Sequence, residues 1–169
     1  KLNIPDIPKG TINPTTLGMV LGALIPENAI VVDESVTTGR EFFYQTAGSH
    51  PHTWLNNCGG SIGFGMPVSI GAAISCPDRK VISLEGDGSA MYTVQSLWTM
   101  ARENLDIVVL IFANQSYKIL QGELTNVGVV NPGKSAMEML SLQDPSLDWV
   151  SLSKGMGVDA VRVDNLEDL

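Results

Sequence analysis

Residues 81–90 read Val-Ile-Ser-Leu-Glu-Gly-Asp-Gly-Ser-Ala, an apolar run that ends in an acidic, glycine-rich turn. Residues 81–84 are mostly apolar on both faces of an extended chain, which is typical of a buried strand in a parallel sheet. Residues 89–103 then place apolar side chains at helical spacing, and Ser89 stands where an N-cap is expected. The stretch therefore predicts one strand–turn–helix unit of a layered α/β protein.

The same unit recurs on both sides of this stretch. Buried-strand patterns occupy residues 30–33 and 107–113, and residues 160–163 form a weaker fourth one. Helical patterns lie between or beside them, at residues 14–24, 38–47, 62–75 and 147–155. This alternation predicts an α/β fold with a three-layer, doubly wound, mostly parallel sheet that carries helices on both faces.

The composition indicates one folded domain and narrows the classes of partner. Of 169 residues, 44% are hydrophobic, which excludes a disordered chain. A formal net charge of −8 argues against nucleic acid or an anionic membrane as a partner. Cys58 and Cys76 are isolated, and His50-Pro51-His52 has no acid or cysteine beside it, so neither a disulfide framework nor a metal site is expected there. This cysteine usage, and the lack of an apolar run of about 20 residues, favour a cytoplasmic location.

The two ends of the sequence suggest a piece of a longer protein. Residues 1–10 contain Pro5 and Pro8 and predict a linker from a preceding domain. Residues 164–169 begin like a helix, with acidic residues in the first turn, and then stop. We therefore expect residues 11–169 to form one ligand-binding domain that is truncated at its C-terminal end.

Polar residues follow each of the three stronger predicted strands, in the segments 34–38, 85–89 and 114–116. In a parallel sheet such segments meet at the carboxyl edge, where α/β proteins bind ligands. Asp87 and Asn114 would come from neighbouring strands and supply a carboxylate and a carboxamide oxygen. Two such oxygens beside a helix N-terminus suit a Mg²⁺ ion that bridges a diphosphate.

Two other nucleotide-binding patterns compete for the glycine-rich turns. Residues 86–88 could open a dinucleotide fingerprint, but Met91 occupies its third glycine position, and Asn114 stands where a ribose-binding acid is wanted. Residues 128–135, Gly-Val-Val-Asn-Pro-Gly-Lys-Ser, match the P-loop pattern letter for letter. Residues 124–127 before them make a poor buried strand, so a surface loop is the preferred interpretation. A P-loop nucleotide-binding module stays as an alternative.

Together these motifs resemble the diphosphate-binding domain of thiamine diphosphate (ThDP) enzymes, the group of acetolactate synthase, benzoylformate decarboxylase and pyruvate decarboxylase. That family carries Gly-Asp-Gly and, further along, Asn, as do residues 86–88 and Asn114. The resemblance runs from about Thr11 onward, and further blocks in the family's order lie at residues 59–67, 96–99, 154–158 and 164–166. It implies an N-terminal pyrimidine-binding domain and a middle domain that this sequence does not contain.

The resemblance implies a role for each residue at the predicted site. Asp87 and Asn114 match the side-chain ligands of Mg²⁺, and the backbone carbonyl of Ser116 would be the third ligand. Leu120 would lie on the substrate side, where pyruvate decarboxylases carry an acid, so that activity is not favoured. The remaining cofactor contacts match the loop residues Ser35 and Thr37, the pyrimidine turn residues Gly60 and Ile62, the diphosphate turn residues Gly86, Gly88, Ser89 and Ala90, and Ile119, which also faces the substrate side.

The implied chemistry is decarboxylation of a small 2-oxo acid with ThDP and Mg²⁺ as cofactors, giving an aldehyde or a carboligation product. In this family the Glu that activates the cofactor belongs to the pyrimidine-binding domain of a neighbouring subunit. We therefore expect no catalytic residue in this chain, no turnover by the chain alone, and a homodimer or homotetramer. Glu34, Tyr117 and Glu123 are expected to face the site region and to be structural or to support the site residues rather than to be catalytic. A non-catalytic interaction domain of the same fold is the second alternative.

Overall fold

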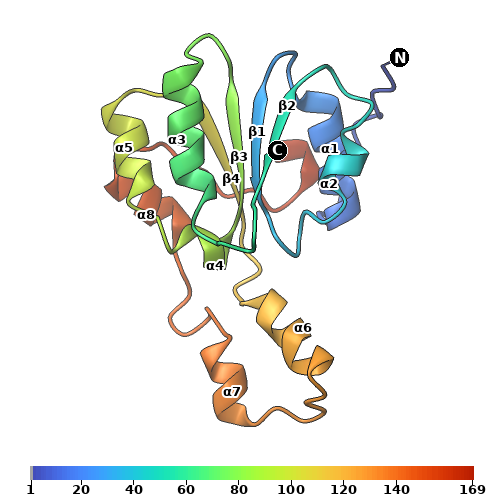
Figure 1. Cartoon of the computed structure of the whole chain (residues 1–169), viewed down its shortest axis with the longest axis vertical. Coiled ribbons are helices and arrows are strands. Elements are labelled where there is room, and N and C mark those ends of the chain that lie inside the picture. The colour runs from blue at the N-terminus through green and yellow to red at the C-terminus, as the bar shows by residue number, and fades with distance from the viewer. Residues whose placement is uncertain (1) are drawn as a thin grey trace.

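A computed structural model describes residues 2–169 and contains a four-stranded parallel sheet (Figure 1). The strands lie in the order β2-β1-β3-β4, and each neighbouring pair is parallel. Their bounds are β1 (Ile30–Glu34), β2 (Thr53–Asn56), β3 (Val81–Gly86) and β4 (Ile107–Phe112). The predicted α/β class and the three predicted strands that became β1, β3 and β4 are confirmed.

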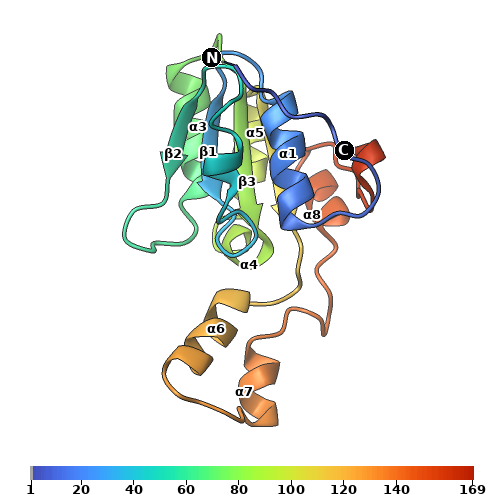
Figure 2. The same cartoon turned by 90° about the vertical axis from the view of Figure 1, so that its right-hand side faces the viewer.

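Helices cover both faces of this sheet (Figures 1 and 2). On one face lie α1 (Pro14–Leu24) and the short α2 (Phe42–Gln45). On the other lie α3 (Gly65–Ser75), α5 (Ser96–Arg102) and α8 (Trp149–Gly155). The single turn α4 (Asp87–Ala90) follows β3 directly, and a 3₁₀ turn, η1 (Leu166–Asp168), contacts α1 near the end of the chain. Within residues 2–169, no helix is both long and apolar enough to cross a membrane.

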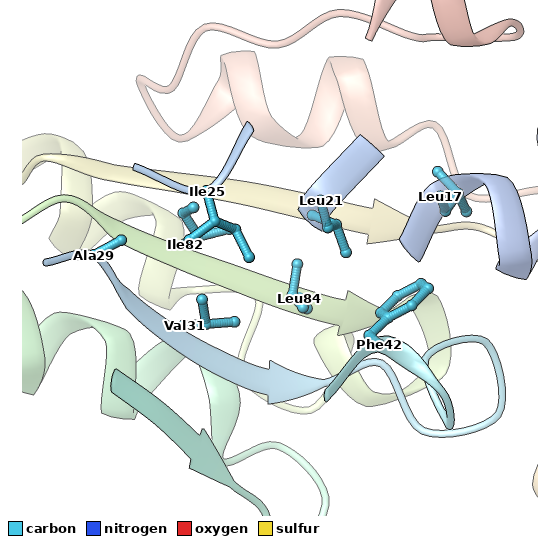
Figure 3. Close-up of a cluster of buried hydrophobic side chains, with 8 residues drawn as sticks. All are labelled: Leu17, Leu21, Ile25, Ala29, Val31, Phe42, Ile82 and Leu84. Carbon is cyan, nitrogen blue, oxygen red and sulfur yellow. The ribbon is translucent and has the colours of Figure 1, made fainter. Parts of the chain in front are cut away.

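The strands are apolar on both faces because each face carries its own core. Val31 and Leu84 pack under α1 and against Phe42 in the cluster drawn in Figure 3. Ile30 and Val32 point the opposite way and pack with Ala73 of α3. A third cluster joins α3, α4, α5 and β4 to α8. This two-sided burial accounts for the continuous apolar runs and confirms the three-layer arrangement.

The first helix begins where the sequence predicts, because its N-terminus is fully capped. Pro14 occupies the first helical position. The side chain of Asn13 accepts a hydrogen bond from Thr16 N at 3.0 Å, and Thr16 Oγ1 accepts one from Asn13 N at 3.0 Å. This reciprocal pair is a capping box and satisfies two backbone donors at once.

Several predicted elements differ in the structure. The helix predicted over residues 89–103 is two helices, α4 and α5, whose N-caps are Gly86 and Gln95, so the prediction of Ser89 as N-cap is wrong. Residues 160–163 do not form a strand, and Val161 is 84% exposed. Conversely, β2 was not predicted, because this half-buried edge strand carries polar residues at both ends.

One segment leaves the layered body. Residues 117–140, here called the arm, carry α6 (Lys118–Asn126) and α7 (Lys134–Met139), and both views show them beyond the carboxyl end of the sheet (Figures 1 and 2). Neither helix contains a buried residue. The two ends of the arm meet at an antiparallel bridge between Ser116 and Ser141. The arm is therefore a helical hairpin attached to the body at one place.

Candidate functional site

The parallel register brings the three predicted polar segments to one edge of the sheet. Glu34 of β1 lies level with Glu85 of β3, and Gly86 lies level with Phe112 of β4. The segments that follow these residues therefore start side by side. This edge is where ligands bind in open parallel sheets.

Asp87 joins the turns that follow β3 and β4. Its side chain is buried, with 2% of its surface exposed. Oδ1 accepts a hydrogen bond from Gly88 N at 2.9 Å, and Oδ2 accepts one from Gln115 N at 2.6 Å. Burial raises the pKa of Asp87, and these two backbone bonds only partly offset the effect. The carboxylate is thus held in place by backbone N–H groups from the turns after β3 and β4.

Asn114 and Ser116 lie beside this carboxylate on the turn after β4. Gln115 between them has a φ of 57°, which reverses the chain within one residue. Asn114 Oδ1 accepts a hydrogen bond from Ser116 N at 3.0 Å, and the Asn114 side chain is exposed. The predicted metal-ligating residues therefore come together, and the donors that they offer are all oxygens. Among residues 2–169, no three His, Cys, Asp or Glu side chains cluster as a metal site would require, so a metal here would depend on such mixed oxygen ligands.

Gly88 is required by a close contact that the sequence did not indicate. A Cβ atom on Gly88 would lie 2.7 Å from Cδ1 and Cε1 of the Tyr117 ring, too close for any side chain there. Gly86 has no such restriction, since its nearest neighbours would lie at 3.8 Å. Ser89 and Ala90 complete α4 and are buried. Tyr117 therefore packs the base of the arm onto the diphosphate turn predicted from the sequence, which supports its expected structural role.

The loop after β1 is fixed by its own side chains. Asp33 Oδ1 accepts hydrogen bonds from Ser35 N at 3.0 Å and from Ser35 Oγ at 2.5 Å. A Cβ atom on Gly39 would lie 1.7 Å from Ser35 Oγ, so the loop closes tightly over this hydroxyl. Thr37 is partly exposed on the same loop. The loop lies at the expected edge, with Ser35 turned inward in this structure and Thr37 toward solvent.

A second glycine-rich turn, residues 57–63, leads into α3. Gly59 and Gly60 have φ values of 71° and 67°, are exposed, and have open space where a Cβ atom would lie. Asn57 Nδ2 donates a hydrogen bond to Ser61 O at 2.9 Å, and Ile62 is half-buried. Only glycine readily adopts the backbone of residues 59 and 60. This turn follows β2 and so places Gly60 and Ile62 at the carboxyl edge of the sheet.

Two buried acids lie beneath this turn, and their arrangement was not predicted. Glu34 Oε1 accepts a hydrogen bond from Gly63 N at 2.5 Å, and Oε2 accepts one from Gly65 N at 2.6 Å. Glu85 is fully buried; its Oε1 accepts a bond from Ser83 Oγ at 2.6 Å, whereas Oε2 has no hydrogen-bond partner. Burial, with a smaller contribution from the charge of Glu34, raises the pKa of Glu85 to about 8, and the Ser83 hydroxyl opposes the rise.

Ile119 and Leu120 lie in the first turn of α6, at the base of the arm, with Leu120 46% exposed.

The residues that match a P-loop, 128–135, lie farther along the arm and run from the end of α6 into α7, and residues 124–126 belong to α6. Helix α6, rather than a strand, leads into this loop, and Lys134 is exposed beside Glu138. The preferred interpretation, a surface loop, is confirmed. The two histidines lie at the amino end of β2, at the opposite edge of the sheet from Asp87.

The fold and this edge define a class of protein. The chain belongs to the thiamine pyrophosphate (thiamine diphosphate) enzymes, because the family model described as thiamine pyrophosphate enzyme, C-terminal TPP binding domain, matches residues 38–169. The resemblance stated from the sequence motifs is thereby confirmed.

Individual relatives point to two enzyme types. Over 97% of its length, the chain is 47% identical to IlvX of Mycobacterium tuberculosis, whose name assigns it provisionally to the acetolactate synthase large subunits. Over 95% of its length, it is 33% identical to benzoylformate decarboxylase of Pseudomonas aeruginosa. Its structure matches a ThDP-dependent 4-hydroxybenzoylformate decarboxylase of Rhodococcus jostii RHA1 with a TM-score of 0.82 and 32% identity, over 99% of this chain and 31% of that one. The chain spans about a third of the two curated relatives, 32% and 29%.

Proposed function

We propose that this chain holds the diphosphate end of thiamine diphosphate through Mg²⁺, as one domain of an enzyme that decarboxylates a small 2-oxo acid. The observation that carries the proposal is the hydrogen bond from Gln115 N to Asp87 Oδ2, which joins the turn after β3 to the turn after β4. This bond holds Asp87 next to Asn114 at the carboxyl edge of the sheet.

The chemistry of these residues fits a magnesium ion. Asp87 supplies a carboxylate, Asn114 a carboxamide oxygen and Ser116 a backbone carbonyl, which are the oxygen donors that Mg²⁺ prefers. Each Asp87 oxygen accepts one backbone bond and keeps a lone pair for a metal. Burial raises the pKa of Asp87, and a divalent cation bound beside it would favour the ionised carboxylate.

The rest of the cofactor would meet backbone groups and glycines. The N–H groups of Ser89 and Ala90, in the first turn of α4, would face the diphosphate. Thr37, on the loop after β1, would bind the phosphates, and Ser35 would do so after its hydroxyl turns away from Asp33. At the other end, the carbonyl of Gly60 and the N–H of Ile62 would meet the pyrimidine, with the Ile62 side chain beneath the cofactor.

The bound cofactor supplies the group that accepts the electrons released when the 2-oxo acid loses carbon dioxide. This chain binds and orients that group, and Ile119 and Leu120 at the base of the arm would line the substrate side. The activating Glu would come from the pyrimidine-binding domain of a neighbouring subunit, so the assembled enzyme would be a homodimer or homotetramer. Acetolactate synthase-like carboligation and benzoylformate decarboxylase-like cleavage both agree with the relatives named above. A cytoplasmic location remains part of the proposal.

Calorimetric titration tests the cofactor assignment. The full-length protein is titrated with ThDP plus Mg²⁺ and, in parallel, with ATP plus Mg²⁺, because the proposed cofactor site is completed by another domain. Asp87→Ala should abolish Mg²⁺-dependent ThDP binding, because it removes the only carboxylate of the proposed metal site. Lys134→Ala is the matched control, since this exposed residue lies on the arm and should not affect ThDP binding.

The two alternatives predict different results. A P-loop nucleotide-binding module would bind ATP and lose it on Lys134→Ala, with no response to Asp87→Ala. A non-catalytic interaction domain would bind neither ligand. Either result would refute the proposal.

A further inference from the structure

Glu34 connects two parts of the candidate site that are far apart in the sequence. It is the last residue of β1, and the loop with Ser35 and Thr37 follows it directly. Its carboxylate reaches across to the start of α3, where it accepts hydrogen bonds from Gly63 N at 2.5 Å and Gly65 N at 2.6 Å. The side chain therefore links the phosphate loop to the end of the turn that carries Gly60 and Ile62.

This carboxylate acts as the cap of α3. The N-cap residue of α3, Phe64, makes no side-chain capping bond. Glu34 is 1% exposed, and among residues 2–169 no ion pair involves it, so backbone N–H groups provide its main compensation. Hydrogen bonds to a buried carboxylate are stronger than bonds between neutral groups, and the N-terminus of an 11-residue helix adds a favourable dipole.

The packing of Glu34 and Glu85 against α3 leaves no room for a side chain at position 65. A Cβ atom on Gly65 would lie 2.9 Å from Glu34 Oε2 and 2.2 Å from Glu85 Oε1. Glycine at position 65 thus lets the helix approach both acids. Glu85 shares the pocket and interacts with the carboxyl group of Glu34, but it accepts its hydrogen bond from Ser83 within β3 and makes none to the turn.

The turn itself has few other restraints. Gly59, Gly60 and Gly63 all have positive φ values, and open space surrounds the first two. Beyond Glu34, the hydrogen bonds that hold the turn to its surroundings include one from Thr93 Oγ1 to Gly63 O at 3.1 Å. A chain of permissive glycines needs an external anchor to hold one conformation, since glycine loses the most conformational freedom on ordering.

We propose that Glu34 is a positioning residue for the pyrimidine end of the cofactor: by anchoring Gly63 and Gly65 it fixes the turn that presents the Gly60 carbonyl and the Ile62 N–H. This inference rests on the proposed function, because it concerns the same cofactor. The carboxylate does not contact the diphosphate turn at Asp87. Its removal therefore weakens binding of the part of ThDP beyond the diphosphate and leaves binding of the diphosphate unchanged.

Two ligands separate these contributions in the full-length protein. Dissociation constants are measured for ThDP and for inorganic pyrophosphate, both with Mg²⁺, in the wild type, Glu34→Gln and Glu85→Gln. Gln at position 34 keeps the shape of the side chain but turns an NH₂ group toward backbone N–H donors that the carboxylate accepts from, those of Gly63, Phe64 and Gly65. Glu34→Gln should weaken ThDP binding at least tenfold and change pyrophosphate binding by less than twofold, since bonds to charged groups contribute factors of about 10 to 100. Glu85→Gln, the same change in the same pocket, should affect neither ligand.

Hydrogen–deuterium exchange provides a readout that does not depend on the cofactor. Peptides covering residues 57–66 should exchange faster in Glu34→Gln than in the wild type or in Glu85→Gln. If Glu34→Gln does not fold, Glu34→Asp replaces it, because the shorter carboxylate keeps the charge but cannot reach both amides. It should show the same selective loss of ThDP affinity.

The measurements distinguish a failure of the role proposed for Glu34 from a failure of the proposed function. An equal loss for ThDP and pyrophosphate, or no loss for ThDP, would overturn the role of Glu34. A wild type that does not bind ThDP, or an Asp87→Ala variant that still binds it with Mg²⁺, would instead overturn the proposed function on which this inference rests.

Discussion

Glu85 lies in the central strand β3 with no exposed surface, and its replacement by Gln tests how that burial affects stability. The pKa of its carboxyl group is raised from 4.5 to about 8, first because burial penalises the charged form. In the unfolded chain the group is ionised above pH 4.5, whereas in the folded chain it keeps its proton up to about pH 8. The folded state therefore binds one more proton than the unfolded state between these values.

This difference sets the sign and the size of the effect. Stability is highest below the unfolded pKa and falls as the pH rises toward 8, with a slope of about 1.4 kcal/mol per pH unit. Between pH 5 and pH 8 the free energy of unfolding should thus fall by roughly 4 kcal/mol. Gln cannot ionise and occupies the same volume, so Glu85→Gln should remove most of the decline. The pKa of Asp87 is also raised by burial, so its effect on stability has the same sign.

Urea unfolding at pH 5, 6.5 and 8, followed by circular dichroism, measures the effect. The free energy of unfolding of Glu85→Gln, relative to that of the wild type, should increase steadily as the pH rises. Glu138→Gln, an exposed change on α7, is the control and should leave the pH dependence unchanged. Parallel curves for the wild type and Glu85→Gln, or an advantage that shrinks as the pH rises, would refute the explanation.

Three further predictions concern stability and are checked by urea or thermal unfolding. Leu84→Ala should lower the free energy of unfolding by about 3 kcal/mol, because Leu84 is fully buried in the core under α1. Gly88→Ala should destabilise the protein through collision with the ring of Tyr117, whereas Gly71→Ala, in open space on α3, should be neutral or stabilise it by up to about 1 kcal/mol. Asn13→Ala should lower the free energy of unfolding by about 1 kcal/mol through loss of the α1 cap. Equal effects of the two glycine changes, or no effect of the other two, would contradict these assignments.

The parts of the fold that could be predicted are those where local pattern and burial agree. Residues 81–84 of β3 and the whole of β4 are apolar or small-residue runs before the segments with Asp87 and Asn114, so both strands and the edge that they share follow from the sequence. β2 could not be identified, because Thr53–Asn56 is a four-residue edge strand whose partner is defined only by the folded sheet. Residues 160–163 show the opposite error: their β-branched pattern is real, but no strand forms there.

The candidate site divides in the same way. Asp87 and Asn114 could be brought together from their positions after neighbouring strands. The role of Glu34 could not, because it depends on residues 63 and 65 lying over the end of β1, a contact across 29 and 31 positions of sequence. In the sequence, Glu34 is only an acidic residue at the end of an apolar strand. That position suggests burial, but it does not identify Gly63 and Gly65 as the hydrogen-bond partners. The sequence likewise places Tyr117 near the site but does not predict that its ring packs against Gly88.

The arm departs from the body and returns to it at the same place. Tyr117 N donates to Leu140 O, and Leu142 N donates to Gln115 O, both at 2.9 Å, so the two ends are joined across the bridge between Ser116 and Ser141. The entropy of closing such a loop grows only with the logarithm of its length, and doubling it costs about 0.6 kcal/mol. Insertions or deletions in the arm therefore leave the sheet edge intact. The length and sequence of the arm can therefore vary during evolution while the carboxyl edge of the sheet, with Asp87 and Asn114, keeps its structure.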